Sequence, residues 1–374
     1  MRIGIVAFPY DDGKSGIWDY IKNIVSAVAA VKGTDEYYIF TAHDFGFNKK
    51  GITQVLFNSW VNSPVINILW HQFYLPYAVK RFGIDVLHLP AGNRRLLLIK
   101  LCKIVATVHD LAQFHIKGKY GALRSLYVKK VLRLLIGNSD KVIAISESTR
   151  KDILKYWGVD DARVVVIPNG LKRASFSKPV NSVMIENILA KYKIQGRYIL
   201  YVSRLEHPGK NHNTLIEAYE KIKRSVDLPH KLVLAGGAWD AADRIYERAE
   251  KSEFRSEIIF PGYVPEEDLA CLYSGADLFV FPSLFEGFGI PLLEAMASGV
   301  PVVCSNTSSL PEVLGGCGLT FDPRDPDDIA KQMKTVLTSE ELRGQYVKLG
   351  LERARQFDWC AIVAKTINIY KQCA

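Results

Sequence analysis

The chain has 374 residues, 48% of them hydrophobic and 23% charged, which is an ordinary balance for a soluble globular protein. This length exceeds what one hydrophobic core supports, so two domains are expected. No apolar run reaches the roughly 18–20 residues of a membrane span, and the short start MRIGIVAF predicts a first strand rather than a signal peptide. The six cysteines are scattered without a C-x-x-C pair, which predicts reduced thiols and a cytoplasmic protein.

The charge is concentrated in the first half of the chain. Residues 1–170 hold 23 Lys and Arg against 13 Asp and Glu, whereas the remainder holds 25 against 26. A basic first half suits a phosphate-bearing acceptor or an anionic lipid surface, which would place the protein peripherally on the inner face of the cytoplasmic membrane. A solvated basic surface without a partner is the alternative. No nucleic-acid-binding motif accompanies the charge, so nucleic acid is not expected as a partner.

The first predicted element is a buried parallel strand at Arg2–Phe8. The GKS tripeptide at 13–15 invites a P-loop interpretation, but that motif needs glycine where Phe8 stands, so ATP hydrolysis by this route is rejected. The better interpretation is a glycine-bearing loop, including Gly16, at the carboxyl end of the first strand. Open α/β sheets bind ligands at that end.

A helix at 19–31 and the strands YYIFTA and DVLHLP follow, and then a strand at 104–108 that ends in His109 and Asp110. A lone histidine is often structural, but one at the carboxyl end of a strand faces the ligand crevice, which favours a function. Asp110 would orient His109 or cap the next turn. Residues 123–135 form a basic amphipathic helix, for which packing against the core is favoured over membrane binding.

The P-N-G turn at 168–170 closes the first domain, and a linker at 172–183 opens the second. Arg204 directly follows the strand YILYVS, and Lys210 stands six residues later, just before a helix. Two cations that reach one point at the carboxyl end of a sheet can neutralise a diphosphate. By themselves they are weak evidence, because Arg and Lys are abundant on protein surfaces.

The stretch DLFVFPSLFEGFGIPLLEAMASGVPVV predicts a strand at 277–281, a loop, a helix from about Pro291 and a strand at 301–303. Glu286 stands in the loop, and Glu294 is expected in the first turn of the helix. A helix N-terminus suits a phosphate, and carboxylates beside it accept hydrogen bonds from hydroxyl groups. The alternative is that both are simply helix-start carboxylates.

E-G-F-G-I-P-L-L-E followed by A-M-A-S-G-V-P-V resembles the E-x7-E signature of retaining glycosyltransferases with the GT-B fold, specifically glycosyltransferase family 4. The resemblance covers nearly the whole chain. It implies an α/β protein with two Rossmann-like, doubly wound parallel-sheet domains facing across a cleft. Their expected ranges are 1–170 and 171–356, with a C-terminal helix at 357–374 that crosses back onto the first domain.

The resemblance also implies roles for individual residues. Glu294 would bind the ribose and Glu286 the hydroxyls of the transferred sugar, while Arg204 and Lys210 bind the diphosphate and His109 contacts the sugar. This sequence lacks the doubled glycine that is common beside the position of Gly16. Further donor contacts would come from Gly16, Val264, Gly287, Phe288, Gly289, Ser309 and Leu310.

The activity implied is retaining transfer of a hexose or deoxyhexose, of the mannose, glucose or rhamnose type, from a GDP-, UDP- or dTDP-linked sugar. The acceptor would be a saccharide or lipid-linked saccharide in surface polysaccharide synthesis. No metal or cofactor is expected, and the D-x-D sequence at 325–327 is interpreted as a helix cap rather than a metal motif. The alternatives are a non-hydrolysing sugar-nucleotide epimerase and a catalytically silent scaffold subunit.

Overall fold

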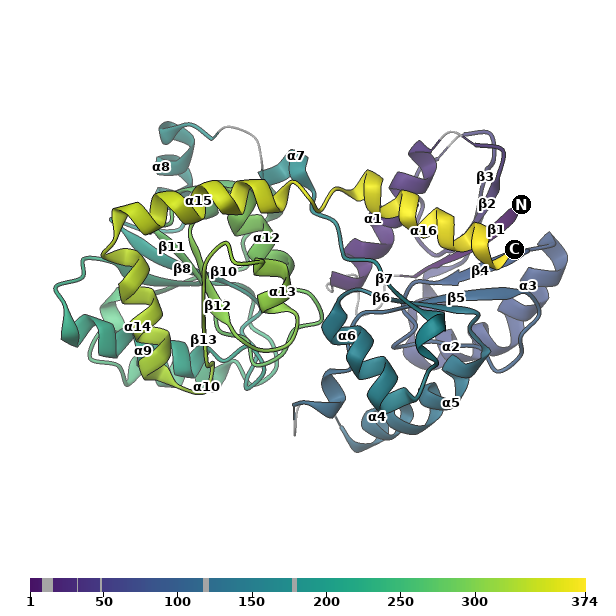
Figure 1. Cartoon of the computed structure of the whole chain (residues 1–374), viewed down its shortest axis with the longest axis horizontal. Helices are drawn as coiled ribbons and strands as arrows, with labels where there is room; N and C mark the ends of the chain where they lie inside the picture. Colours follow the sequence, from purple (N-terminus) through teal and green to yellow (C-terminus); the bar gives the residue numbers. More distant parts are fainter. Residues whose placement is uncertain (9–15, 32, 48, 117–120, 177–179) are drawn as a thin grey trace. The chain divides into compact units, whose positions relative to one another are not determined.

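The computed structural model describes residues 1–8, 16–31, 33–47, 49–116, 121–176 and 180–374 (Figure 1). The chain forms two compact units: unit 1 is Met1–Gly170 with Trp359–Ala374, and unit 2 is Leu171–Asp358. None of the helices among the described residues has the length and apolar character needed to cross a bilayer. All six cysteines are free thiols.

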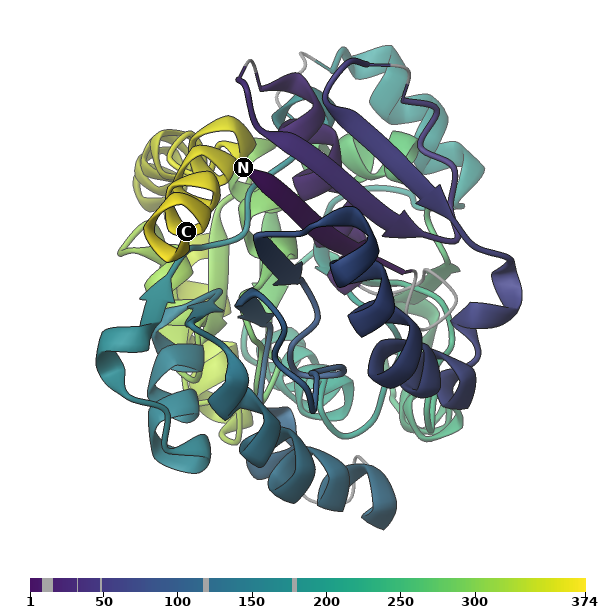
Figure 2. The same cartoon turned by 90° about the vertical axis from the view of Figure 1, so that its right-hand side faces the viewer.

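Unit 1 is built on a seven-stranded parallel sheet in the order β3-β2-β1-β4-β5-β6-β7. From β1 the sheet grows first on one side, through β2 to β3, and then on the other side, from β4 to β7. The strand order therefore reverses between the neighbours β1 and β4. Helices cover both faces of the sheet (Figure 2), which is why its central strands are almost wholly apolar and buried. The strands are β1 Arg2–Ala7, β2 Glu36–Thr41, β3 Ile52–Leu56, β4 Val86–Leu89, β5 Lys103–Val108, β6 Lys141–Ala144 and β7 Val164–Val166.

The predicted basic helix exists, and its Val128, Leu132 and Leu135 are buried, as expected for a helix that packs on the core. It contains a π-helical section, as does the helix that spans residues 64–82. The helices of unit 1 are α1 Gly16–Ala30, η2 Ser59–Asn62, α2 Pro64–Leu69, η3 Trp70–Tyr74, α3 Leu75–Phe82, η4 Ala112–Phe114, α4 Ala122–Leu126, η5 Tyr127–Leu132, α5 Arg133–Leu135, η6 Ile136–Asn138, α6 Glu147–Asp152, η7 Ile153–Trp157, η8 Asp161–Arg163 and α16 Trp359–Cys373.

A buried polar chain fastens the last helix, α16, to the sheet. The Tyr370 hydroxyl lies 2.7 Å from Nδ1 of His88 on β4, and Nε2 of His88 lies 2.9 Å from the Thr107 hydroxyl on β5. Thr107 in turn lies 3.2 Å from the hydroxyl of Tyr20 on α1. All four side chains are buried away from water, so the hydrogen bonds between them satisfy polar atoms that water cannot reach.

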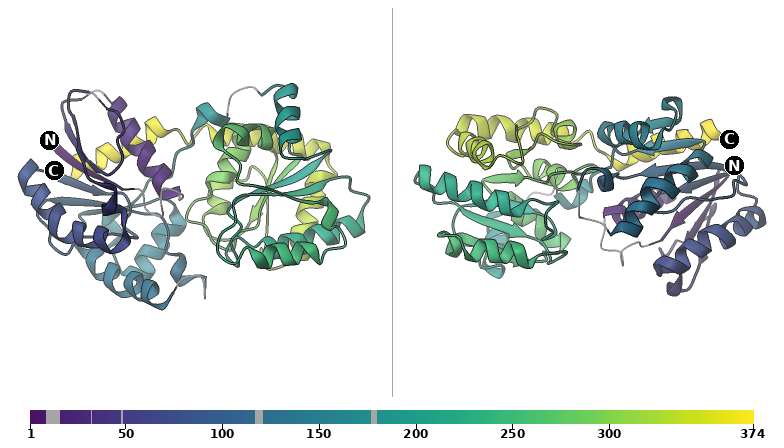
Figure 3. Two further views of the ribbon diagram at one scale, coloured as in Figure 1. Left: turned by 180° about the vertical axis from the view of Figure 1, so that it is seen from behind. Right: turned by 90° about the horizontal axis from the view of Figure 1, so that it is seen from below.

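Unit 2 repeats the plan with a six-stranded parallel sheet in the order β10-β9-β8-β11-β12-β13, so the order reverses between β8 and β11. Helices again lie on both faces (Figure 3). The strands are β8 Tyr198–Val202, β9 Lys231–Ala235, β10 Ile258–Gly262, β11 Leu278–Phe281, β12 Val302–Ser305 and β13 Leu319–Phe321. The helices are α7 Arg173–Phe176, α8 Ser182–Lys191, α9 His212–Ser225, α10 Asp243–Glu250, η9 Arg255–Glu257, α11 Glu266–Ser274, α12 Ile290–Ala297, α13 Leu310–Leu314, α14 Pro326–Leu337 and α15 Glu340–Ala354.

The structure describes part of one segment singled out in the sequence, the linker at 172–183, but not another, the GKS tripeptide at 13–15. The linker expected at 172–183 is partly helical, because α7 begins within it and buries Phe176, whose ring contacts Tyr273 at a centroid distance of 5.9 Å. The GKS tripeptide at 13–15, on which the P-loop interpretation was rejected, lies outside the described residues.

Acid should weaken unit 1 because it contains three buried, neutral histidines. Burial lowers the pKa of His71 and His88 to about 3 and that of His109 to about 4. An unfolded histidine titrates near 6.5, so the unfolded chain binds more protons as the pH falls from about 6.5 towards 4, and stability is lost across that window. Five of the six tryptophans belong to unit 1, so tryptophan fluorescence reports its unfolding.

The measurement is the unfolding midpoint of the fluorescence transition at a series of pH values. Replacing the exposed His43 by asparagine should leave the acid dependence unchanged. A midpoint that does not move between about pH 6.5 and 4.5 would contradict the assignment of these histidines as buried and neutral.

Candidate active site

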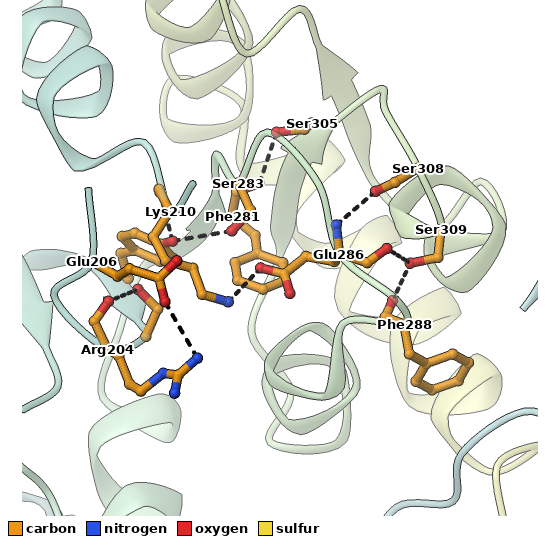
Figure 4. Close-up of polar contacts among 12 residues, drawn as sticks. Arg204, Glu206, Lys210, Phe281, Ser283, Glu286, Phe288, Ser305, Ser308 and Ser309 are labelled. Atoms are coloured by element: carbon orange, nitrogen blue, oxygen red, sulfur yellow. Dashed lines mark hydrogen bonds and ion pairs between the residues drawn. The ribbon is translucent and has the colours of Figure 1, made fainter. Parts of the chain in front are cut away.

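The predicted polar residues of unit 2 gather where the order of its sheet reverses. Arg204 and Lys210 lie in the loop that follows β8, and Glu286 lies in the loop that follows β11. These two strands are neighbours, with Leu278 paired to Ile199 and Phe279 to Leu200. The carboxyl ends of strands at such a reversal form the usual ligand crevice of a doubly wound sheet. The structure therefore brings the three side chains to one place (Figure 4).

The centre of this group is an ion pair. Nζ of Lys210 lies 2.6 Å from Oε1 of Glu286, and both side chains are about five-sixths buried, with exposed fractions of 17% and 16%. The backbone at Lys210 is held by a hydrogen bond of 2.8 Å that the hydroxyl of the buried Tyr201, on β8, donates to the Lys210 carbonyl. A charge-assisted bond with so little exposure is short and geometrically specific.

The loop that carries Glu286 is held from two sides. On one side, the amide of Leu284 donates to the carbonyl of Gly209, at 3.0 Å. On the other, the Ser308 hydroxyl accepts from the amide of Glu286 at 3.0 Å, and the Ser309 hydroxyl lies within 3.0 Å of the carbonyls of Glu286 and Phe288. Ser309, predicted to contact a donor, thus also supports the glutamate loop.

The loop enters α12 through Gly289, which has a φ of 105°. A Cβ atom at that position would lie 2.7 Å from Cδ2 of the buried Leu310, so both the backbone conformation and the space favour glycine. The ring of Phe288 is buried and packs against Phe357, with centroids 5.8 Å apart, so contact with a ligand here would come from the backbone of the Gly287–Gly289 segment.

The expected position of Glu294 in the first turn of its helix is wrong. Because Gly289 allows α12 to begin at Ile290, Glu294 falls at the fifth helical residue, beyond the unpaired amides of the helix start. Its carboxylate instead accepts a 2.9 Å hydrogen bond from the hydroxyl of Tyr273 on α11. Burial, and next the neighbouring carboxylate, raise the pKa of Tyr273 well above its usual value, so the phenol stays protonated and donates.

Arg204 has a partner that was not identified from the sequence. Its guanidinium lies 4.7 Å from the centroid of the Trp239 ring, and its Nη2 lies 3.3 Å from Oε2 of the buried Glu206. Trp239 belongs to the loop after β9, and its amide donates to the carbonyl of Leu205 at 3.0 Å. The only sequence signal was an aromatic residue shortly after a strand that ends in two glycines.

The first of these glycines, Gly236, is what lets the loops after β8 and β9 touch. Its φ is 154°, and a Cβ atom there would lie 1.8 Å from the carbonyl oxygen of Ser203. Any side chain would push the two loops apart and move Trp239 away from Arg204. In the short loop between β10 and α11, the predicted base contact Val264 is buried, while the preceding Tyr263 is exposed.

The two site residues predicted in the first half, Gly16 and His109, both belong to unit 1. Gly16 is the first residue of α1. His109 directly follows β5 and is buried, with its Nε2 2.7 Å from the carbonyl oxygen of Pro90 and its ring edge-on to Tyr20 at 4.8 Å. A carbonyl only accepts, so Nε2 carries the proton and Nδ1 has a lone pair available to accept a hydrogen bond.

Two smaller expectations are resolved by hydrogen bonds. The carboxylate of Asp110 accepts from the amide of Ala112 at 3.2 Å, which is the capping role and not the orientation of His109. The carboxylate of Asp325 accepts from the amide of Asp327 at 2.9 Å at the start of α14, so the helix-cap interpretation is confirmed. Among the described residues, no cluster of three or more His, Cys, Asp or Glu side chains is placed to hold a metal ion.

Comparison with known proteins accounts for both halves of the chain. The family model "Glycosyltransferase Family 4" matches residues 15–174, and the model "Glycosyl transferases group 1" matches residues 184–353. O-antigen chain mannosyltransferase B of Escherichia coli is 35% identical over 274 residues, which cover 73% of this chain and 71% of the relative.

Two further proteins extend the comparison. Serotype-specific mannosyltransferase WbdA of Escherichia coli is 32% identical over 262 residues, which are 69% of this chain but 32% of WbdA, so the match spans about a third of that protein. The crystal structure of HepE from Anabaena in complex with UDP and glucose superposes with a TM-score of 0.75 at 17% identity, with all of both chains covered. At that identity the likeness concerns the fold.

The Lys210–Glu286 pair should contribute measurably to stability. Lys210→Ala or Glu286→Ala is expected to reduce the free energy of unfolding of unit 2, and the coupling energy from the double-mutant cycle should be about 1–2 kcal/mol because the pair is mostly buried. The matched control is the Lys221–Asp327 pair of the same unit, whose side chains are 32% and 74% exposed. The coupling energy of this exposed pair should not exceed about 0.5 kcal/mol. Equal coupling energies for the two pairs would contradict the claim that burial strengthens the Lys210–Glu286 pair.

Proposed function

This chain belongs to glycosyltransferase family 4 and has the GT-B fold, and we propose that it transfers mannose from GDP-mannose with retention of anomeric configuration. The acceptor is a saccharide or lipid-linked saccharide of a surface polysaccharide, and the enzyme works at the inner face of the cytoplasmic membrane. The observation that carries the proposal is the Lys210–Glu286 pair, placed at the reversal point of the second sheet. The choice of mannose is supported by the two mannosyltransferase relatives.

In this proposal the departing diphosphate is stabilised by fixed positive charge. Lys210 has three N–H donors, so it can keep its bond to Glu286 while donating to a phosphate oxygen. Arg204 presents its guanidinium from the face of Trp239, where it is held before any ligand arrives. Charge stabilisation by groups already in position is usually the largest single contribution in such sites, and these two cations supply it without a divalent metal.

The carboxylates recognise hydroxyl groups of the donor. We assign Glu286 to the hydroxyls of the transferred sugar and Glu294 to the ribose, since an ionised carboxylate is a strong acceptor for O–H groups. The Tyr273 hydroxyl fixes the orientation of Glu294. We also assign donor contacts to the backbone of Gly16 and of the segments 287–289 and 309–310, and a contact with the nucleotide base to Val264.

His109 acts as a neutral acceptor in this proposal. Burial is the main cause that lowers its pKa to about 4, so the imidazole is uncharged at physiological pH. With the proton on Nε2 committed to the Pro90 carbonyl, Nδ1 accepts a hydrogen bond from a hydroxyl of the donor sugar. Its contribution should therefore be independent of pH above about 5.5.

The first test is calorimetric binding of GDP, UDP and dTDP to the full chain, each with EDTA and with magnesium. GDP is expected to bind most tightly, equally well in EDTA, and to lose most of its affinity in Lys210→Ala. The control Lys221→Ala changes a lysine of the same unit whose pair is exposed and should bind GDP as the wild type does. Tighter binding of UDP or dTDP would overturn the choice of donor, and a strict need for magnesium would overturn metal independence.

The second part of this test separates the alternatives by product. Incubation with GDP-mannose and a mannoside acceptor should give an α-linked product by NMR, and Glu286→Gln should lower the rate by about a hundredfold. A sugar nucleotide altered at one carbon in the absence of acceptor would indicate an epimerase. Failure to bind any nucleotide would indicate the scaffold alternative, and full activity of Glu286→Gln would show that the site is wrongly assigned.

Trp239 should influence donor affinity only through Arg204. Trp239→Ala is expected to weaken GDP binding by about two- to fivefold, the usual value of an exposed cation–π contact, whereas Trp239→Phe should retain most of the affinity. In the Arg204→Ala background, the change at Trp239 should have little further effect. Equal losses in both backgrounds would show that Trp239 contacts the ligand itself.

A further inference from the structure

Unit 1 has a helix with an apolar stripe on its exposed side. Val65, Leu69, Phe73 and Tyr77 follow one another at intervals of four residues along α2, η3 and α3, and each is at least half exposed, with Phe73 at 74%. Trp60, just before this helix, is exposed as well. The opposite side of the helix supplies the buried residues Asn67, Trp70, His71, Leu75, Ala78 and Val79. The stripe is therefore additional to the face that packs on the core, and the core does not explain it.

The basic helix at 122–135 has the same character. Leu123, Leu126 and Leu134 are exposed, the first of them to 85%, although Val128, Leu132 and Leu135 already provide its buried face. Lys130 and Arg133 are exposed among these leucines. An exposed leucine stripe interrupted by cations is typical of a helix that lies in a lipid interface, where the aliphatic stems of basic residues cover apolar surface and their charges reach the headgroups.

The two helices are joined by one segment, residues 94–99, which hydrogen bonds to both. On the first side, the amide side chain of Gln72 donates to the Leu96 carbonyl at 2.8 Å and accepts from the amide of Leu98 at 2.9 Å. On the second side, the Tyr127 hydroxyl donates to the carbonyl of Arg94, at 3.2 Å. Leu98 and its neighbour Ile99 are both more than half exposed, so the segment that bonds to both helices adds apolar surface of its own.

Charge identifies the occupant of this surface. Between residues 45 and 139 the chain has 14 Lys and Arg but only two acidic residues, Asp85 and Asp110. A second copy of the chain would bring one basic surface against another and would be repelled. An anionic bilayer complements both features of this surface, because its acyl layer can contact the apolar stripes and its negative headgroups can bind the cations.

We propose that the exposed faces of residues 60–77, 98–99 and 123–134, here called the docking face, insert into the headgroup region of an anionic phospholipid bilayer. The apolar stripes supply the penetrating contact, and Lys80, Arg81, Lys130 and Arg133 at their edges supply the attraction to phosphate. The docking face lies in unit 1, whereas the residues assigned to the donor nucleotide lie mainly in unit 2. The inference rests on the membrane location in the proposed function, and it can fail while the proposed transfer from GDP-mannose holds.

The test is cosedimentation of the full chain with vesicles of phosphatidylcholine alone or mixed with phosphatidylglycerol. Binding is expected only with the anionic lipid and should decrease with salt, since the Debye length shortens from about 10 Å at 0.1 M to about 3 Å at 1 M. Leu69→Ser/Phe73→Ser should reduce the partition coefficient by at least about tenfold, and Lys130→Ala/Arg133→Ala by about fivefold for each charge removed.

A matched double variant controls for the general effect of replacing two exposed apolar side chains by serine. Val183 and Met184 on α8 of unit 2 are also exposed, and Val183→Ser/Met184→Ser should bind vesicles as the wild type does. GDP binding and the circular dichroism melt of each variant establish that folding and the donor site are intact. Lipids with brominated acyl chains should also quench part of the tryptophan fluorescence of the wild type. This quenching should be lost in Trp60→Phe.

Three results would overturn the proposal. The first is equal binding to neutral and anionic vesicles, which would remove the role of charge. The second is wild-type binding by Leu69→Ser/Phe73→Ser, which would place the contact elsewhere. The third is self-association of the chain that is lost in this variant and is not accompanied by vesicle binding, which would make the docking face an interface between two copies.

Discussion

The arrangement of the second sheet's ligand edge depends on one ion pair that bridges two loops. Lys210 follows β8 and Glu286 follows β11, so their contact joins the two strands at the point where the sheet order reverses. Around it, the Tyr201 hydroxyl, the Gly209 carbonyl and the two serines 308 and 309 fix the backbone on each side. The opposite charges compensate one another where little water reaches, so the site holds its cation in position without leaving an unpaired buried charge.

The same principle, support by neighbouring groups, applies to the other site residues. Arg204 lies against Trp239, Glu294 accepts from Tyr273, and His109 is bonded to the carbonyl of Pro90. In each case the partner comes from a different loop or helix than the residue it supports. Geometry of this kind is set by packing of the whole unit, and rigid support of this sort is what a site needs to bind a charged ligand without reorganisation.

The sequence predicted the architecture well because its signals are local. Continuous apolar runs predicted β1, β5, β8 and β11, and they placed His109 and Arg204 just after strands and Glu286 in the loop after β11, where the structure has them. What it missed depends on contacts between distant segments. The helix α12 begins at Ile290, one residue before the expected start at about Pro291, after a glycine whose missing Cβ would lie against the distant Leu310. Trp239 escaped notice because only the absence of a side chain at Gly236 brings its loop onto Arg204.

The buried chain from Tyr370 through His88 and Thr107 to Tyr20 has a consequence for how the polypeptide is made. Residues 171–358 form unit 2 without interruption, whereas unit 1 also needs α16, which is synthesised after all of unit 2. Until those residues emerge, His88 and the apolar side chains beneath α16 lack their partners, while unit 2 is already complete. Unit 1 therefore completes its core only after unit 2 has been synthesised, although most of its residues precede unit 2 in the sequence, and a chain cut short before residue 359 leaves unit 1 with an open core.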